Sequence, residues 1–126
     1  MSFESALVTE LTSNAALSAL VGGDRVRPVF RPEEETFPCV VYTVISTDQM
    51  SNLAGRDTSL RNIRVQIDLW CRTHDDLIAL ADAVKVQMNA ATGFKSTLLP
   101  SGFDDYEPEM DLLHKVLEFS CWYKEA

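Results

Sequence analysis

Residues 61–91 read RNIRVQIDLWCRTHDDLIALADAVKVQMNAA, and this stretch decides the fold. In its first part, apolar side chains recur at every second position: Ile63, Val65, Ile67, Leu69 and Cys71. Such alternation is typical of a strand with one buried face, and a slip of one residue would turn all of these side chains to water. The sequence therefore predicts a strand over Asn62–Arg72 with a fixed register.

The second part of the stretch is typical of a capped amphipathic helix. Thr73 can accept a hydrogen bond from the amides of the first turn, and Asp76 stands where a capping box places an acid. Apolar residues follow at helical spacing: Leu77, Leu80, Ala81, Val84, Met88 and Ala91. Gly93 can take the left-handed conformation that ends a helix. We expect a helix over 74–91.

The chain before this stretch predicts a helix, an edge strand and a second long strand. Apolar residues at helical spacing indicate one N-terminal helix that can break near Ser13-Asn14 and ends at Gly22-Gly23. Pro28 cannot donate to a ladder, so Arg25–Phe30 is predicted to be an edge strand or an extended lead-in. Cys39–Thr47 is rich in β-formers and apolar on both faces, which predicts a central strand or one covered by another element or subunit.

The remaining segments predict two loops and two strands. Asp48–Leu60 is polar and contains Gly55, so we expect a long, mobile connection that becomes ordered only in an assembly. Phe94–Leu99 predicts a short strand and Leu112–Tyr123 a long one. Between them, Phe103–Asp111 is expected to be a solvated acidic loop, because it lacks the spacing of a calcium loop. The predicted fold is a single α+β domain over residues 1–126, with an antiparallel or mixed sheet of about four strands packed against two helices.

Composition excludes several classes of protein. The chain has 126 residues, of which 46% are hydrophobic and 24% charged, and no apolar run approaches the ~20 residues of a membrane span. Met1-Ser2-Phe3-Glu4 carries no secretory signal, which makes the cytoplasm the default compartment. A net charge of −8 opposes binding to nucleic acid. Three widely spaced cysteines, Cys39, Cys71 and Cys121, are expected to be buried free thiols.

No catalytic, cofactor-binding or metal-binding residue can be named from the sequence. His74 and His114 belong to no ligand pattern and are expected to be exposed polar side chains. The glycines form neither a dinucleotide fingerprint nor a phosphate loop, and no serine or cysteine stands in a nucleophile elbow. We therefore expect no enzyme and no cofactor.

Five segments, in this order, resemble the tail-completion, or tail-terminator, family of long-tailed bacteriophages and prophages. They are Ala19-Leu20-Val21-Gly22, Arg25-Val26-Arg27-Pro28, Phe37-Pro38-Cys39-Val40-Val41-Tyr42, the strand and helix from Val65 to Val84, and Phe119-Ser120-Cys121-Trp122-Tyr123. The resemblance spans nearly the whole chain. It implies a non-catalytic protein that caps the tail tube and joins it to the head.

The resemblance also implies partners and a location. Copies of the chain, monomers in isolation, would form a homo-oligomeric ring, commonly a hexamer, that contacts the tail tube protein and the head-side connector protein. The ring would assemble in the host cytoplasm and then belong to the virion tail, with no sequence-specific nucleic acid and no membrane as partner. Candidate residues for the subunit or tube interface are Gln49, Met50, Ser51, Asn52, Leu53, Arg56, Asp57 and Trp122.

The alternative is a small-ligand-binding or regulatory α/β module. Such a module needs convergent polar groups in an apolar cavity, and the sequence does not single any out. Tail-assembly genes beside this gene would favour the first function, and metabolic genes the second.

Overall fold

The computed structural model describes residues 2–13, 15–22, 25–29 and 36–125. The α+β class is confirmed, but the chain forms six strands and three helices, which is more than the four strands and two helices expected. In chain order the elements are α1 (Phe3–Ser13), α2 (Ala15–Val21), β1 (Val26–Pro28), β2 (Cys39–Ser51), β3 (Asp57–Cys71), α3 (His74–Asn89), β4 (Lys95–Leu98), β5 (Phe103–Glu107) and β6 (Leu112–Lys124).

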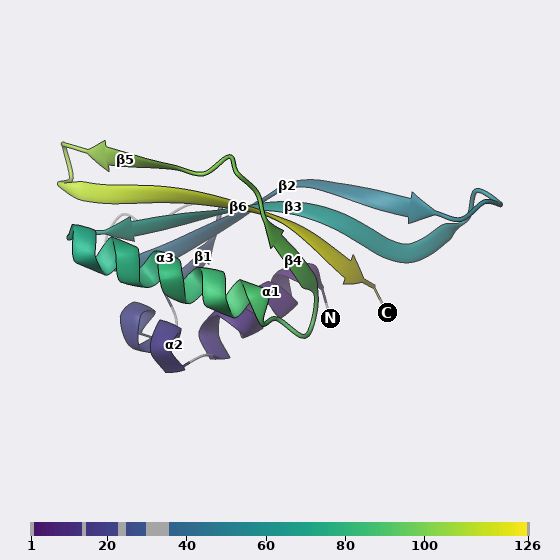
Figure 1. Cartoon of the computed structure of the whole chain (residues 1–126), viewed down its shortest axis with the longest axis horizontal. Coiled ribbons are helices and arrows are strands. Elements are labelled where there is room, and N and C mark those ends of the chain that lie inside the picture. Colours follow the sequence, from purple (N-terminus) through teal and green to yellow (C-terminus); the bar gives the residue numbers. More distant parts are fainter. Residues whose placement is uncertain (1, 14, 23–24, 30–35, 126) are drawn as a thin grey trace.

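All strands belong to one mixed sheet. Its order is β1-β2-β3-β6-β4, and β5 also pairs with β6. Only β1 pairs in parallel, with β2, and the other pairs are antiparallel. The three helices lie on one face of the sheet (Figure 1), so the apolar core lies between that face and the helices. The other face carries no helix among the described residues.

The predicted register of β3 is confirmed. Its five alternating apolar residues are all buried, with at most 3% of any side chain exposed. They pack in one core cluster with the helix residues Leu77, Leu80 and Val84. The five residues face the helices, because side chains at every second position of a strand point to the same face.

The start of α3 matches the prediction and its end does not. The Thr73 hydroxyl accepts a hydrogen bond from the Asp76 amide at 3.2 Å, as expected for an N-cap. The helix ends at Asn89, and the amide of the C-cap residue Ala90 donates to the Val86 and Gln87 carbonyls at 3.1 and 3.2 Å. Gly93 does not have a positive φ and is not a left-handed cap. These hydrogen bonds already pair carbonyls of the last turn, so the helix end does not need a left-handed residue at Gly93.

The N-terminal region forms two helices, since α1 ends at Ser13 and α2 begins at Ala15. Gly22 follows α2 with φ of 67°, so this predicted helix end is confirmed. β1 is an edge strand next to β2, as Pro28 indicated. Phe30, the last residue of the predicted edge strand, lies outside the described residues.

Two segments that were expected to be loops are strands. β2 continues to Ser51 and β3 begins at Asp57, so most of the predicted loop Asp48–Leu60 is a ladder. Likewise, the first part of the predicted acidic loop is β5, an edge strand in which all residues except Glu107 are exposed. In both segments the side chains meet water on both faces. Neither set of alternate positions must then be apolar, so the composition of such a strand does not differ from that of a loop.

β2 is an interior strand along its first residues, as one of the two expectations for Cys39–Thr47 stated. It lies between β1 and β3 in the sheet. Val40 and Tyr42 belong to the helix-side core cluster. Val41 alternates with them and pairs with Asp68, and only 4% of it is exposed. Burial on both faces explains why neither parity of this segment is polar.

Candidate functional site

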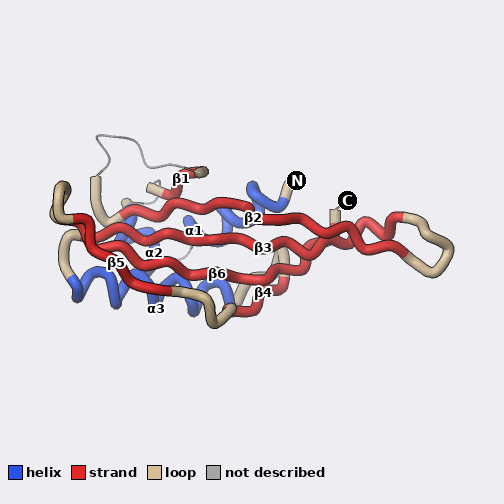
Figure 2. The backbone as a smooth tube through the Cα atoms, turned by 90° about the horizontal axis from the view of Figure 1, so that it is seen from above, coloured by secondary structure: helices blue, strands red, loops and turns tan. Residues whose placement is uncertain are grey.

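The most prominent feature of the molecule is a hairpin arm that projects beyond the body of the sheet (Figures 1 and 2). We define the arm as residues 49–61, with its base at the Gln49–Arg61 pair. The parallel strand β1 pairs with β2 only as far as Tyr42, and β6 pairs with β3 only from Leu60 onward. The arm therefore stands largely outside the sheet, held by its own two strands.

The arm ends in an ordered turn. The Asn52 side-chain oxygen accepts hydrogen bonds from the Ala54 and Arg56 amides, both at 3.0 Å. The Asn52 amide donates to the Arg56 carbonyl at 2.8 Å, and Gly55 supplies the positive φ of 77° that the turn requires. This turn leaves the Leu53 side chain fully exposed, at 110% of its reference area.

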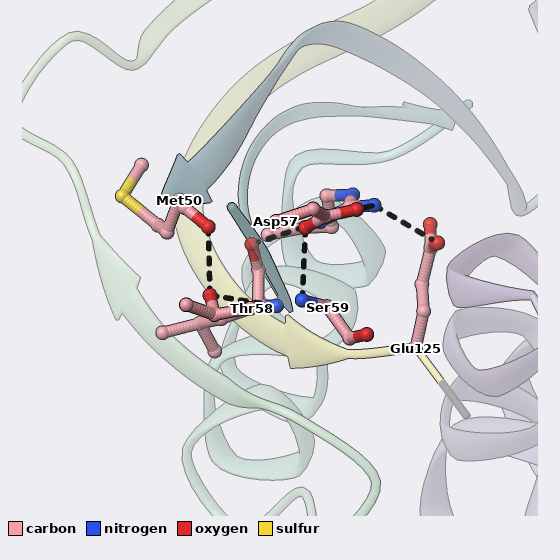
Figure 3. Close-up of polar contacts among 7 residues, drawn as sticks. Met50, Asp57, Thr58, Ser59 and Glu125 are labelled. Atoms are coloured by element: carbon pink, nitrogen blue, oxygen red, sulfur yellow. Dashed lines mark hydrogen bonds and ion pairs between the residues drawn. The ribbon is translucent and has the colours of Figure 1, made fainter. Parts of the chain in front are cut away.

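A bulge lies between the tip and the base. From Asp57 to Arg61, β3 advances four residues while β2 advances two, and Ser59 has φ of 65°. The Thr58 hydroxyl donates to the Met50 carbonyl across the two strands at 2.7 Å (Figure 3). Bulges bend and twist a ladder, so this irregularity sets the direction of the tip.

Charged groups brace the bulge. The Arg61 guanidinium donates two hydrogen bonds to the Asp57 carboxylate, at 2.7 and 2.9 Å, and lies 3.4 Å from the Glu125 carboxylate. The Ser59 amide donates to Asp57 at 2.9 Å (Figure 3). The Glu125 amide donates to the Ser59 carbonyl at 2.9 Å. The chain end after β6 is thus tied to the base of the arm.

The hydrogen bonds that Asp57 accepts from Arg61 and Ser59 predict how the base of the arm responds to acid. The hydrogen bonds from Arg61, and then the one from the Ser59 amide, hold the pKa of Asp57 below its ordinary value of 3.8. The stabilising contribution is therefore complete above pH 3.8 and is lost as the pH falls through the lowered pKa. In Arg61→Gln we expect the pKa of Asp57, measured by an NMR titration of its carboxyl carbon, to rise toward 3.8.

Glu118 provides the internal control for this titration. Its pKa is lowered by hydrogen bonds from Ser101 and Arg64, away from Arg61. It should not move in Arg61→Gln. An unchanged Asp57 titration, or an equal shift of both carboxyls, would contradict the brace.

The face without helices carries a polar network between β3 and β6. The Asp68 carboxylate accepts from Gln66 at 2.8 Å and lies 3.0 Å from His114 Nε2. The His114 ring stacks on Trp70 with centroids 3.9 Å apart. His114 is thus a half-buried member of a network, and the expectation of an exposed side chain was wrong for it, because its strand neighbours on the same face cover it. His74 is exposed, as expected.

The structure brings most of the predicted interface residues together. All of them except Trp122 lie on the arm, although as a hairpin and not as the loop that was expected. Trp122 lies on β6 near the arm's base, because it pairs with Asn62, which pairs in turn with Asp48. Its side chain is 43% exposed.

Four residues that hold the base of the arm could not be named from the sequence. They are Thr58, Ser59, Arg61 and Glu125. Asp57 and Arg61 stand four residues apart, a spacing that joins side chains on a helix but separates them along a regular strand. Only the bulge brings them together, and the sequence carries no signal for that bulge.

The part of the chain that the structure describes contains no side-chain cluster of the kind that holds a metal ion. Across residues 2–13, 15–22, 25–29 and 36–125, no three His, Cys, Asp or Glu side chains gather as they would around a metal ion. All three cysteines are buried thiols outside any disulfide, and burial raises the pKa of both Cys71 and Cys121 to about 12. None of the described helices has the length and apolar character needed to cross a membrane.

These features define a class: a small α+β protein with a single mixed sheet and a projecting hairpin arm. Comparison with known families then identifies the chain. Residues 5–124 match the family described as tail completion protein gp17, and the chain belongs to that family. The resemblance found in the sequence is confirmed, and the chain is a structural protein of a phage or phage-like tail.

Comparison with solved structures supports the fold. A chain of the "Virion of native gene transfer agent (GTA) particle" aligns with a TM-score of 0.66 at 17% identity, covering 98% of this chain and 95% of that one. A chain of "Structure of without transmembrane region from Akkermansia muciniphila" aligns with a TM-score of only 0.36 at 8% identity, over 67% of this chain and 45% of that one, and carries no argument. No curated protein matches.

Proposed function

We propose that this protein caps the finished tail tube as a homo-oligomeric ring, with six copies as the expected number, and joins the tube to the head-side connector without catalysing a reaction. The observation that carries this proposal is the braced arm with a fully exposed leucine at its tip. A large apolar side chain held in water gains nothing for the isolated chain. Its ordered presentation fits a side chain that becomes buried in an assembly.

Ring formation also fits the asymmetry of the molecule. One arm projects from one end of the sheet (Figures 1 and 2). When such an arm contacts a different surface of the next copy, the interface is head-to-tail, and repetition of that interface by rotation closes a ring. The arm residues named above and Trp122 are the proposed contacts with the neighbouring copy or with the tail tube protein.

The charge of the chain fits its place at the end of a tube that DNA must cross. A net charge of −8 repels the phosphate backbone, so an acidic ring would let DNA pass without holding it. The proposed partners are therefore further copies of the chain, the tail tube protein and the connector protein. Assembly in the host cytoplasm would precede incorporation into the virion.

Labelling of purified particles tests this position. Antibody fragments raised against the chain should bind tails as a single cluster at the end that meets the head, seen by negative-stain electron microscopy of tails separated from heads. Tails from an unrelated phage serve as the control. Label along the whole tail, or only at the distal tip, would contradict the capping role and return attention to the ligand-binding alternative.

A further inference from the structure

A groove runs between the first turns of α3 and the β5–β6 side of the sheet. Its apolar lining comes from Leu77, Ile78 and Ala81 on α3. The polar lining around them consists of His74, Asp82, Lys85, Asp104 and Lys115. The cavity volume is about 210 Å³. Leu77 and Ala81 are buried, whereas Ile78 is 47% exposed, so Ile78 is the apolar side chain of this groove that water reaches in the isolated chain.

The groove and the arm lie toward opposite ends of the molecule. In both Figure 1 and Figure 2, the first turns of α3 and β5 lie at the left, and the arm projects to the right. The tip of the arm therefore cannot enter the groove of its own chain. The arm tip (the knob) and the groove (the hole) can therefore contact each other only between two copies of the chain, which is a heterologous contact.

The two surfaces also match in polarity, and one acid of the groove, Asp82, suits the charge of Arg56 at the tip. The tip presents the apolar Leu53 beside Arg56, and the groove presents an apolar lining beside Asp82. Within the described part of the chain, neither the Arg56 guanidinium nor the Asp82 carboxylate has a hydrogen bond or an ion pair. Lys115, by contrast, is already neutralised by Asp104 at 2.7 Å. Asp82 is thus the acid in the groove that is open to a cation from outside.

We propose that Leu53 at the arm tip of one copy inserts into the α3 groove of the next copy, with Arg56 facing Asp82. This interaction deepens the proposed function, on which it rests, by naming the surface that receives the arm. The apolar contact supplies attraction, and the charge pair at its rim sets the register of the two copies. Because each copy carries one knob and one hole, the same contact repeats around the ring.

Cross-linking in assembled tails tests the contact directly. In a phage whose chain carries both Leu53→Cys and Ile78→Cys, a short bismaleimide should join neighbouring copies into a ladder of multimers on a denaturing gel. The native cysteines are buried and will not compete. Chains with only one of the two new cysteines should form at most occasional dimers.

The outcomes separate this inference from the proposed function. Particles of normal infectivity, with both new thiols modified by the reagent and no ladder, would overturn the knob-and-groove contact while leaving the capping role intact. Cross-linking of the new thiol at position 53 to a different protein would overturn it too, and would assign the arm to the tail tube or the connector. Loss of label from the head-proximal end of the tail would instead remove the capping role itself.

A charge exchange provides a second test. Arg56→Asp and Asp82→Arg should each lower the infectious titre about tenfold, because each places like charges face to face, and the double variant should recover to within about threefold of the parent. Glu109→Arg is the control, since it reverses an exposed charge outside the groove and should leave the titre unchanged. A double variant no better than the worse single variant would contradict the Arg56–Asp82 pair.

Discussion

Replacement of residues 52–56 by an Asn-Gly pair should leave a folded protein and lower the yield of infectious phage about a thousandfold, because one lesion is repeated at every junction of a ring. The replacement removes Leu53 and Arg56. It also keeps the Ser51–Asp57 pair, which a two-residue Asn-Gly turn can close. The core does not involve the tip, so the thermal midpoint of the purified chain should be unchanged.

Electron microscopy of the lysate should then show unjoined heads and tails, some tails being of abnormal length. Ala54→Ser is the matched control, because it changes an exposed tip residue while keeping Leu53, Arg56 and the turn bonds. A strain lacking the whole gene sets the baseline. Normal infectious particles from that strain would reject the tail assignment, whereas normal particles from the tip replacement alone would move the interface away from the arm.

The sequence predicts those parts of the fold in which burial imposes a pattern. β3 and α3 each have one face against the core, and the alternation of Ile63 to Cys71 and the helical spacing of Leu77 to Met88 record that burial directly. The cap at Thr73 is equally readable, because a local side-chain bond determines it. For these elements, sequence and structure agree because the pattern of burial along the element is written in its own residues.

The parts that were missed are those in which no burial pattern exists. In the arm, both faces of each strand meet water, so Gln49, Ser51 and Asp57 can occupy ladder positions. Composition then indicates a loop, although the backbone pairing continues. β5 escaped detection for the same reason, as an exposed edge strand that pairs with β6 alone.

The segment that the sequence singles out as a candidate interface is a hairpin and not the loop that was expected. Polar composition and length singled out the segment around Leu53, and the hairpin does gather those residues at one end of the molecule. What the sequence could not supply is the set of contacts that holds the base of the arm. These contacts depend on the bulge at Ser59 and on Glu125, which comes from the far end of the chain.

The core under the sheet should respond sharply to truncation at one position and hardly at all at the next. Ile67 is fully buried in the cluster with Leu77, Leu80 and Val84. Ile67→Ala removes buried methyl groups and leaves a cavity, so it should lower the free energy of unfolding by about 2–5 kcal/mol. Urea denaturation followed by tryptophan fluorescence would measure this.

Gln66→Ala is the matched control, one residue away in the same strand. The Gln66 side chain points to the face without helices, where it donates one hydrogen bond to Asp68 and is half-buried. Its loss should cost about 1 kcal/mol or less, the usual net contribution of one such bond. Successive side chains of β3 point to opposite faces of the sheet, so only one of these two residues can face the helices. Equal costs for Ile67→Ala and Gln66→Ala would therefore contradict the register of β3.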